Sequence, residues 1–421
     1  MAREHPRASA ARRLGIYSDG PFRVLDCSNG LRLAPDPADH PFLTFACAVG
    51  SRFDSTTIFA RARRADQAEG WPILPEEVAF VELPYYESLT RLGALVRAIP
   101  GTIRGFWRGL RDVDVVWVLG PHPFAFLLVP LALARRRRVV LGVRQDSLAY
   151  YRSRLPSQRW RPALLAARAW DLGFRLLARR LPTIVVGPEL AHQYGGPRPS
   201  LLTTTVSLLR SADVASAPRE ADWTSEVSLL AVGRIDREKN PLLLVEALAR
   251  LEHERQGRFR LVWAGTGPLV QDVLRRASDL GVANRIELLG FVPFGPELLE
   301  RYRNAHAFVH VSLTEGVPAT VIEALASGTP VVATAVGGVP AALDGGRAGI
   351  LVPPSDLDAL VAGILRVADE RELRERLVRR GLELARGHTL ERHTARIARF
   401  ISGEPAVPQD LVEGIGPDTG V

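Results

Sequence analysis

The sequence predicts an α/β protein with two doubly wound parallel sheets in tandem. A chain of 421 residues is too long for one ordinary core. Short apolar strands alternate with helical stretches along both halves. Residues 211–225 are rich in Ser, Ala, Asp and Pro and have no clear period. We therefore expect a first domain at 1–210, a linker at 211–227 and a second domain at 228–387.

Strands in the first half are predicted from apolar segments bounded by turn residues. They fall at 14–17, 43–49, 78–83, 115–119, 139–143 and 183–186, with a further strand at 201–208.

The segment 113–134, followed by four arginines, resembles a membrane span. It is interrupted by Asp114, Gly120 and three prolines, and its longest run without a polar side chain, 124–134, is too short to cross a bilayer. A buried strand, a loop and a short helix are predicted instead.

The second half repeats the alternation more regularly. Strands are predicted at 229–232, 260–264, 286–289, 307–311, 330–333 and 349–352, and helices at 357–368 and 370–385. Thr389 can cap a last helix that ends at Phe400. We expect residues 388–402 to pack back on the first domain and residues 403–421 to form a flexible tail.

Cysteine content and the amino terminus indicate a cytoplasmic protein. Two cysteines, Cys27 and Cys47, are too few for a disulfide framework or a zinc site, which favours a reducing compartment. The first 13 residues are polar and Arg-rich, without the apolar segment of a signal peptide.

Positive charge is concentrated at residues 135–180, which hold thirteen arginines and two aspartates in a chain of net charge +8. Within 155–181, arginines alternate with apolar residues, most of them at helical spacing. Two interpretations remain open. The segment is an amphipathic surface for an anionic membrane, or its Trp and Leu residues are core and its arginines coat the solvent face. No nucleic-acid-binding motif accompanies the charge.

Lys239 is the only lysine among 54 Lys and Arg residues. It follows the predicted strand 229–232, together with Gly233 and Arg234. Glycine and two spaced cations after a strand suit a phosphate, and a compact ammonium is not interchangeable with a guanidinium fork. The alternative is an exposed loop cation.

Glycines follow two more predicted strands. Gly265 and Gly267 stand between a strand and a helix, where glycine lets backbone N–H groups approach an anion. A tight turn also requires glycine for steric reasons alone. Gly337 and Gly338 occupy a similar position after the strand at 330–333.

Two carboxylates, Glu315 and Glu323, are separated by seven residues. Pro318 suits the first position of a helix and Gly328 the position after its end. Glu315 would then precede the helix, and Glu323 would lie in its second turn among apolar residues. A carboxylate in that setting needs hydrogen-bond donors, which a ribose diol supplies. The alternative is a surface Glu and a structural salt bridge. All these segments follow strands of one sheet, so we expect them to converge.

Residues 229–355 resemble the nucleotide-sugar-binding half of the GT-B glycosyltransferases, in particular retaining family 4 (glycosyl transferases group 1). The resemblance is carried by 232–234 with Lys239, 265–268, 289–292, 315–332 and 337–352. It implies the GT-B fold: two Rossmann-like doubly wound domains facing across a cleft, with the acceptor on the first and the donor on the second.

The resemblance also implies residue roles. Arg234 and Lys239 would bind the donor diphosphate and stabilise it as it leaves, Glu315 would lie beside the transferred sugar, and Glu323 would hold the ribose. Further donor contacts are implied for Gly265, Gly267, Gly316, Val317, Pro318 and Ala319, with Phe291 and Val292 facing the nucleobase. Two fixed cations make a metal unnecessary, and no cofactor is expected.

The first half matches the family less well. Gly20 is the counterpart of a donor-binding loop glycine, and His122, after the strand at 115–119, is the counterpart of a histidine that touches the donor sugar. Loop packing is an equal alternative for His122. Asp146, after the strand at 139–143, is a weak candidate for acceptor binding.

The resemblance thus implies a retaining hexosyltransferase that uses a UDP- or GDP-linked sugar. Its acceptor would be lipid-linked or a cell-envelope or exopolysaccharide glycan, and the enzyme would be cytoplasmic or peripheral at the inner face of the plasma membrane. Two alternatives stay open: another GT-B sugar-nucleotide enzyme, of the epimerase or phosphorylase type, and a nonenzymatic nucleotide-sugar-binding module.

Overall fold

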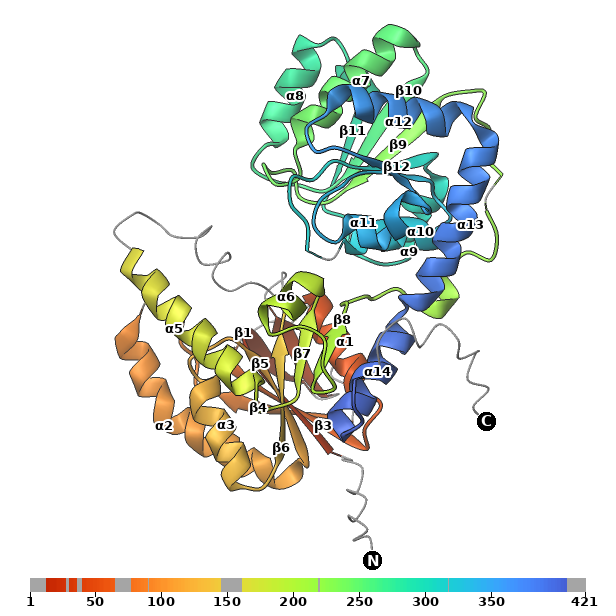
Figure 1. The fold of residues 1–421 in the computed structure, drawn as a ribbon. Coiled ribbons are helices and arrows are strands. Elements are labelled where there is room, and N and C mark those ends of the chain that lie inside the picture. Colours follow the sequence, from red (N-terminus) through yellow and green to blue (C-terminus); the bar gives the residue numbers. More distant parts are fainter. Residues whose placement is uncertain are drawn as a thin grey trace, which may run out of the picture. The chain divides into compact units, whose positions relative to one another are not determined.

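The computed structural model describes residues 13–27, 30–35, 40–64, 77–89, 91–144, 161–218, 220–316 and 318–406. The chain forms two compact units (Figure 1). The first combines Met1–Val206 with Glu391–Val421, and the second comprises Ser207–Leu390. Each unit is a Rossmann-like α/β domain around a parallel sheet, which confirms the predicted fold class.

The first unit contains an eight-stranded sheet with the order β4-β3-β1-β5-β6-β7-β8, and β2 pairs antiparallel with β1. The other pairings are parallel. The strands are β1 (Arg13–Cys27), β2 (Gly30–Pro35), β3 (Ser55–Arg64), β4 (Val78–Leu83), β5 (Val115–Gly120), β6 (Arg138–Val143), β7 (Thr183–Val186) and β8 (Leu201–Thr204).

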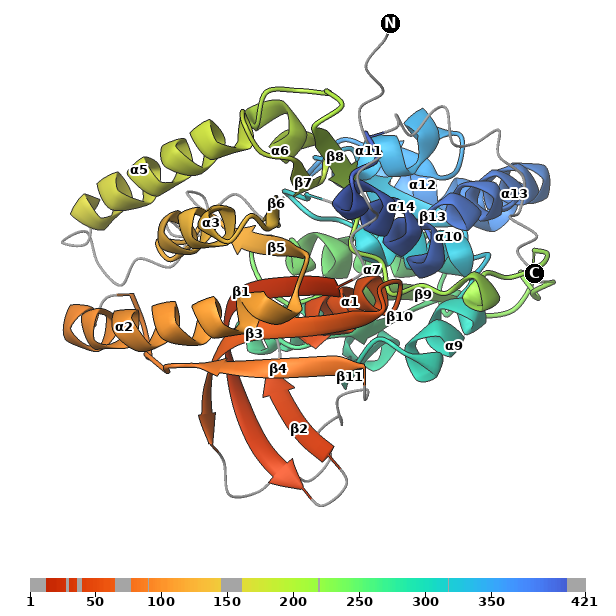
Figure 2. The same ribbon diagram turned by 90° about the horizontal axis from the view of Figure 1, so that it is seen from below.

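Helices cover both faces of this sheet (Figures 1 and 2). One face carries α2 (Leu92–Gly109), α3 (Ala125–Ala134) and α5 (Arg161–Ala178), whose Phe106, Leu128 and Phe174 pack in one apolar cluster with Val116 and Val118 of β5. The opposite face carries α1 (His40–Gly50) and α14 (Leu390–Ser402). The short α6 (Pro188–Gln193) follows β7.

One strand predicted in the first half was wrong. Residues 43–49 form part of α1 rather than a strand, because Phe45, Ala46 and Val49 are buried at helical spacing. The strand predicted at 14–17 extends to Cys27 through an irregularity between Ser18 and Phe22. Strands β2 and β3 were not predicted; the exposed arginines at the end of β3 obscure its apolar pattern.

The segment 113–134 folds as predicted, with β5 followed by a loop and the ten-residue α3. Within the described ranges, no helix has the length and apolar character needed to cross a membrane.

The second unit contains a six-stranded, fully parallel sheet with the order β11-β10-β9-β12-β13-β14. All six predicted strands are present, each with ends within two residues of the prediction. They are β9 (Val227–Val232), β10 (Phe259–Ala264), β11 (Ile286–Gly290), β12 (Ala307–His310), β13 (Val331–Thr334) and β14 (Ile350–Val352).

Helices also cover both faces of the second sheet (Figure 1). One face carries α7 (Pro241–Glu254), α8 (Val270–Asp279) and α12 (Leu357–Asp369). The other carries α9 (Pro296–Asn304), α10 (Ala319–Ala326) and α11 (Val339–Ala342), and α13 (Arg371–Gly387) packs on α10.

The segment after the first unit packs on the second. The Ala215 N–H donates to the Ala326 carbonyl at 2.8 Å, and the Arg374 guanidinium lies 4.1 Å from the Trp223 ring centroid. Helix α14 packs on the first unit, where His393 Nδ1 lies 3.4 Å from Thr204 Oγ1. Of the tail expected at 403–421, residues 407–421 lie outside the described residues.

Candidate active site

The loops at the carboxyl ends of β9, β10, β12 and β13 are hydrogen-bonded to one another. The β9 loop joins the β10 loop and the β12 loop, and the β12 loop joins the β13 loop. The backbone bonds are Ile235 N–H to Thr266 O (3.1 Å), Leu313 N–H to Glu238 O (2.8 Å) and Gly338 N–H to Gly316 O (3.2 Å). The four segments singled out in the sequence therefore converge at one edge of the second sheet.

The glycines of these loops are required by close backbone contacts. A Cβ on Gly265 would lie 1.9 Å from the Gly233 carbonyl oxygen, and one on Gly267 would lie 2.3 Å from that of Ile235. Gly337 has φ +50°, and its Cβ would lie 1.6 Å from the Glu315 carbonyl oxygen. Steric need thus accounts for these glycines, while the donor contacts assigned to Gly265 and Gly267 stay predictions.

Glu315 is the centre of the site. It lies in the loop between β12 and α10, and only 10% of its side chain is exposed. Its Oε1 forms an ion pair with Lys239 Nζ, accepts a hydrogen bond from Ser312 Oγ at 3.0 Å and lies 3.0 Å from His310 Nε2. Three polar groups therefore meet at one carboxylate oxygen.

These neighbours keep Glu315 ionised. Burial alone would raise the pKa of this carboxyl, but the contacts with His310 and Lys239 outweigh burial and lower the pKa to about 2. A fixed negative charge is thus present throughout the physiological pH range.

The two cations of the predicted clamp have different environments. Lys239 is 23% exposed, and its N–H donates to Asp236 Oδ1 at 3.2 Å. Arg234 is 70% exposed, and its Nε lies 3.5 Å from Asp236 Oδ2. Lys239 is thus held inside the site, whereas Arg234 extends into solvent from the same loop.

Glu323 lies in the second turn of α10, as predicted. It is partly buried, and Tyr302 donates its hydroxyl to Oε2 at 3.0 Å. Burial raises the pKa of Glu323 to about 7, although the Tyr302 hydrogen bond lowers it. Pro318 is the residue before the helix rather than its first helical residue, while Gly328, with φ +70°, follows the helix end as predicted.

The remaining donor candidates lie around the same edge. Phe291 is exposed and Val292 partly buried in the loop after β11, and Ala319 is the first residue of α10. Open space surrounds Gly316 where a Cβ would stand. Val317 lies outside the described residues.

In the first unit, four side chains contact Asp19 beside the carboxyl end of β5. His122 Nε2 lies 3.0 Å and an Arg61 nitrogen 3.6 Å from Oδ2, while Tyr86 and Tyr17 donate their hydroxyls to Oδ1, Tyr17 at 3.4 Å. Burial would raise the pKa of Asp19, but His122, Arg61 and Tyr86 lower it overall. Asp19 is therefore held as an ionised centre of this cluster.

His122 is buried, and both of its ring nitrogens face protein groups. Nδ1 accepts a hydrogen bond from the Phe124 N–H at 3.3 Å, and Nε2 faces Asp19. Gly20 lies inside β1 rather than in a loop after it. Asp146 lies outside the described residues.

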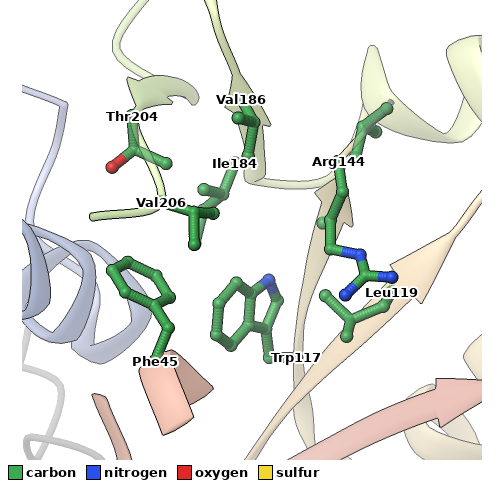
Figure 3. A pocket seen from close by; sticks show the side chains of 10 residues that line it. Phe45, Trp117, Leu119, Arg144, Ile184, Val186, Thr204 and Val206 are labelled. Carbon is green, nitrogen blue, oxygen red and sulfur yellow. The ribbon is translucent and has the colours of Figure 1, made fainter. Parts of the chain in front are cut away.

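A small pocket also lies at the carboxyl end of the first sheet. Figure 3 shows its apolar wall, with Trp117 near Phe45 and the Arg144 side chain beside Leu119. Its volume is about 10 Å³, which is the size of one water molecule rather than of a sugar.

Sequence reasoning missed His310, Ser312 and Tyr302 around the two glutamates, and in the first unit it missed Asp19 with its partners Tyr17, Arg61 and Tyr86. For His310 and Ser312 the signal is position, since they stand at or just after the carboxyl end of β12, where ligand sites of parallel sheets gather. Asp19 lacks this signal, because it lies inside the long strand β1. Tyr302 carries no such signal, because it lies on α9 and reaches Glu323 only through packing.

Comparison with known proteins identifies the family. The model of the family described as glycosyl transferases group 1 matches residues 218–383. D-inositol 3-phosphate glycosyltransferase 1 of Catenulispora acidiphila is 30% identical over 307 residues, which are 69% of this chain and 72% of that protein. The chain belongs to the glycosyl transferases group 1 family. O-antigen chain mannosyltransferase B of Escherichia coli is 32% identical over 168 residues, which are 40% of this chain and 43% of that protein.

Several of the family matches are partial. The alignments with the Escherichia coli protein and with two Corynebacterium D-inositol 3-phosphate glycosyltransferases span 40% to 44% of those relatives' length. Solved structures share the GT-B fold across nearly the whole chain. WaaG, a glycosyltransferase involved in lipopolysaccharide biosynthesis, has a TM-score of 0.65 and 14% identity over 93% of this chain and 100% of its own. HepE of Anabaena, solved with UDP and glucose, has a TM-score of 0.63 and 17% identity over the same shares.

Proposed function

We propose that this glycosyl transferases group 1 protein transfers a hexose-like sugar from a UDP- or GDP-linked donor to an acceptor hydroxyl, with retention at the anomeric carbon. The supporting observation is the convergence of Lys239, Glu315 and Glu323 at the carboxyl edge of the second sheet in a member of this family. The UDP bound to HepE lends support to a nucleotide donor, at the level of a shared fold.

The chemistry follows from the charges of the site. Breaking the bond between the sugar and the diphosphate builds negative charge on the diphosphate, which Lys239 and Arg234 stabilise from one loop. Glu315, ionised beside them, accepts hydrogen bonds from sugar hydroxyls, and Glu323 accepts those of the ribose. The departing phosphate takes the acceptor proton, so the reaction needs neither a separate general base nor a metal.

We assign the acceptor to the first unit and propose a lipid-linked or cell-envelope glycan. The support is an exposed apolar layer on that unit. Of the ten exposed large hydrophobic side chains in the described residues, six lie on three neighbouring helices: Val96 and Trp107 on α2, Leu133 on α3, and Leu165, Leu172 and Leu176 on α5.

The charge around this layer is positive. Exposed arginines accompany the apolar residues, namely Arg97, Arg104 and Arg108 on α2, Arg168 on α5 and Arg179 just after it. Asp171 of α5 is already paired with Arg175 at 2.7 Å. Exposed leucines interleaved with arginines suit the surface of an anionic bilayer, so we propose peripheral docking at the inner face of the plasma membrane.

The donor proposal is tested by thermal denaturation with UDP, GDP, ADP and the corresponding nucleotide sugars. Binding to the native state adds about 2.7 kcal/mol to the free energy of unfolding at a hundredfold excess over Kd, and so raises the melting temperature. We expect one base to stabilise the protein and its sugar to be transferred or slowly hydrolysed. The proposal fails if no nucleotide stabilises the purified chain.

A further inference from the structure

We propose that His310 and Ser312 are positioning residues, which hold the Glu315 carboxylate by one oxygen so that Lys239 can leave it for the donor diphosphate. This inference rests on the proposed function and adds a step to it. Lys239 is held on Glu315 before the donor binds, and His310 takes its place afterwards.

The Oε1 atom of Glu315 is crowded. A carboxylate oxygen has about two lone-pair directions. Three groups approach this oxygen: Lys239 Nζ, Ser312 Oγ at 3.0 Å and His310 Nε2 at 3.0 Å. His310 Nε2 is buried. Its contact with Glu315 Oε1 is close but is not aligned as a hydrogen bond, and the described residues offer it no other partner. Three polar groups therefore share about two lone-pair directions. When one of the bonded groups leaves, His310 Nε2 can take the direction that it vacates.

The three groups around this oxygen differ in their freedom to move. His310 is the last residue of β12, paired in register with Ala333, and it is almost fully buried. Ser312 is also buried, and its carbonyl accepts the Thr334 hydroxyl at 2.7 Å. Lys239 sits on a flexible four-carbon stem and is the most exposed of the three. The ammonium is therefore the mobile partner.

Electrostatic attraction also favours the transfer of Lys239 to the donor. A nucleoside diphosphate carries more negative charge than one carboxylate and competes effectively for the ammonium. In the loop before α7, Asp236 accepts the Lys239 N–H at 3.2 Å and its Oδ2 lies 3.5 Å from Arg234 Nε. The loop after β13, residues 335–338, contributes no titratable side chain. After Lys239 moves, His310 Nε2 and Ser312 Oγ are the groups that still lie 3.0 Å from Glu315 Oε1.

The kinetic test uses His310→Leu, which removes the polar nitrogen, and His310→Gln, which keeps an N–H donor. In His310→Leu we expect kcat to fall by up to about 100-fold with donor KM little changed, because a displaced carboxylate misplaces the sugar. The acid limb of kcat/KM should move to higher pH. His310→Gln should recover most of kcat, and Ser312→Ala should show a smaller loss.

The matched control is His306→Gln, at the other end of the same strand. His306 Nδ1 accepts a hydrogen bond from the Ser228 N–H at 3.1 Å, far along β12 from Glu315, so the substitution perturbs the unit without touching the carboxylate. Its pH profile should match the wild type. The proposal would be overturned if the acid limb of kcat/KM does not shift in His310→Leu. It would also be overturned if that limb shifts equally in His306→Gln and His310→Leu.

A second readout does not depend on catalysis. The carboxyl carbons of ¹³C-labelled Glu are followed by NMR across pH, and Glu315→Gln identifies the Glu315 signal. We expect this signal to titrate at higher pH in His310→Leu than in the wild type, and an unchanged titration contradicts the positioning role. A shifted titration in a protein that transfers no sugar would refute the proposed function while leaving the placement of His310 intact.

Discussion

The only lysine of the chain, Lys239, forms an ion pair with Glu315, the first of the two spaced carboxylates. The contact joins residues 76 positions apart and ties the loop after β9 to the loop after β12. The cation proposed for the diphosphate and the carboxylate proposed for the sugar are therefore assembled before any donor arrives. Each partner can be altered with little change in size, which makes the pair experimentally accessible.

We expect Glu315→Gln to abolish most transfer while nucleotide binding persists. The amide keeps the shape of the side chain but removes the fixed charge, so the rate should fall by roughly 100-fold or more. Transfer is measured with the nucleotide sugar found by melting, and binding by the melting shift with its free nucleoside diphosphate. Glu238→Gln, an exposed carboxylate of the neighbouring loop, is the control and should stay active. Near wild-type transfer in Glu315→Gln would remove this carboxylate from the mechanism.

Lys239→Arg should impair transfer, although arginine fills the other 53 cationic positions. A planar, wider guanidinium replaces a compact ammonium in a site where Lys239 is largely enclosed and Glu315 almost fully buried. We expect kcat/KM to fall by about tenfold or more, measured with saturating acceptor. Arg237→Lys, two residues away and exposed, makes the reverse exchange and should have no effect. A fully active Lys239→Arg enzyme would leave Arg234 as the only clamp residue.

The second unit was predictable because its short strands are mostly apolar and alternate regularly with helical segments. In the first unit, β3 begins with a buried segment around Ile58 but ends in arginines, and α1 contains the apolar run Leu43–Val49 that also fits a strand. Whether such a segment folds as a helix or a strand depends on its burial in the tertiary structure rather than on its local sequence pattern.

The candidate site was predictable to the extent that its residues follow strands in sequence. Lys239, Glu315 and Glu323 do so, and their loops do meet. The contact between Lys239 and Glu315 was not predictable, because it depends on side-chain reach across loops 76 residues apart. Tyr302 reaches Glu323 from another helix, and Asp19 gains its partners from three further segments.

Gly337→Ala should destabilise the second unit, whereas Gly316→Ala in the facing loop should not. Gly337 has φ +50°, and its added Cβ would meet the Glu315 carbonyl oxygen at 1.6 Å, while Gly316 has open space. We expect Gly337→Ala to lose at least about 2 kcal/mol of unfolding free energy. Chemical denaturation monitored by tryptophan fluorescence measures both variants. Equal stabilities would show that the two loops do not pack as described.

Glu323 should make stability and nucleotide affinity depend on pH. Its pKa of about 7 in the folded state exceeds the ordinary value of 4.5, so the folded protein binds an extra proton between these values. Stability from this group therefore falls as pH rises through that window. Conversely, affinity for a nucleoside diphosphate should increase from pH 6 to pH 8, because the ionised carboxylate is the better acceptor for ribose hydroxyls.

Glu323→Gln is the reference protein for these pH profiles. The ligand titrates in the same way with both proteins, so a difference between their profiles comes from Glu323. The variant should show a smaller decline in melting temperature from pH 5 to pH 8 than the wild type. Its nucleotide Kd, measured by calorimetry, should lack the part of the pH dependence that Glu323 contributes. Identical pH profiles for both proteins would contradict the assignment of Glu323 to the ribose.

The apolar layer of the first unit should determine membrane binding. Leu165 and Leu172 are 64% and 60% exposed on one face of α5, so replacing both by Ser changes little in the fold. Each leucine contributes about 1.5 kcal/mol when buried in the interface, so the double variant should partition into vesicles roughly 100-fold less. Co-sedimentation with phosphatidylglycerol vesicles measures this, and phosphatidylcholine vesicles and added salt should both weaken wild-type binding. Leu274→Ser on α8 of the second unit, 43% exposed in the wild type, is the matched control and should bind normally. If the wild-type protein does not bind anionic vesicles, the apolar layer is not a membrane-binding surface, and the acceptor proposal loses its structural support.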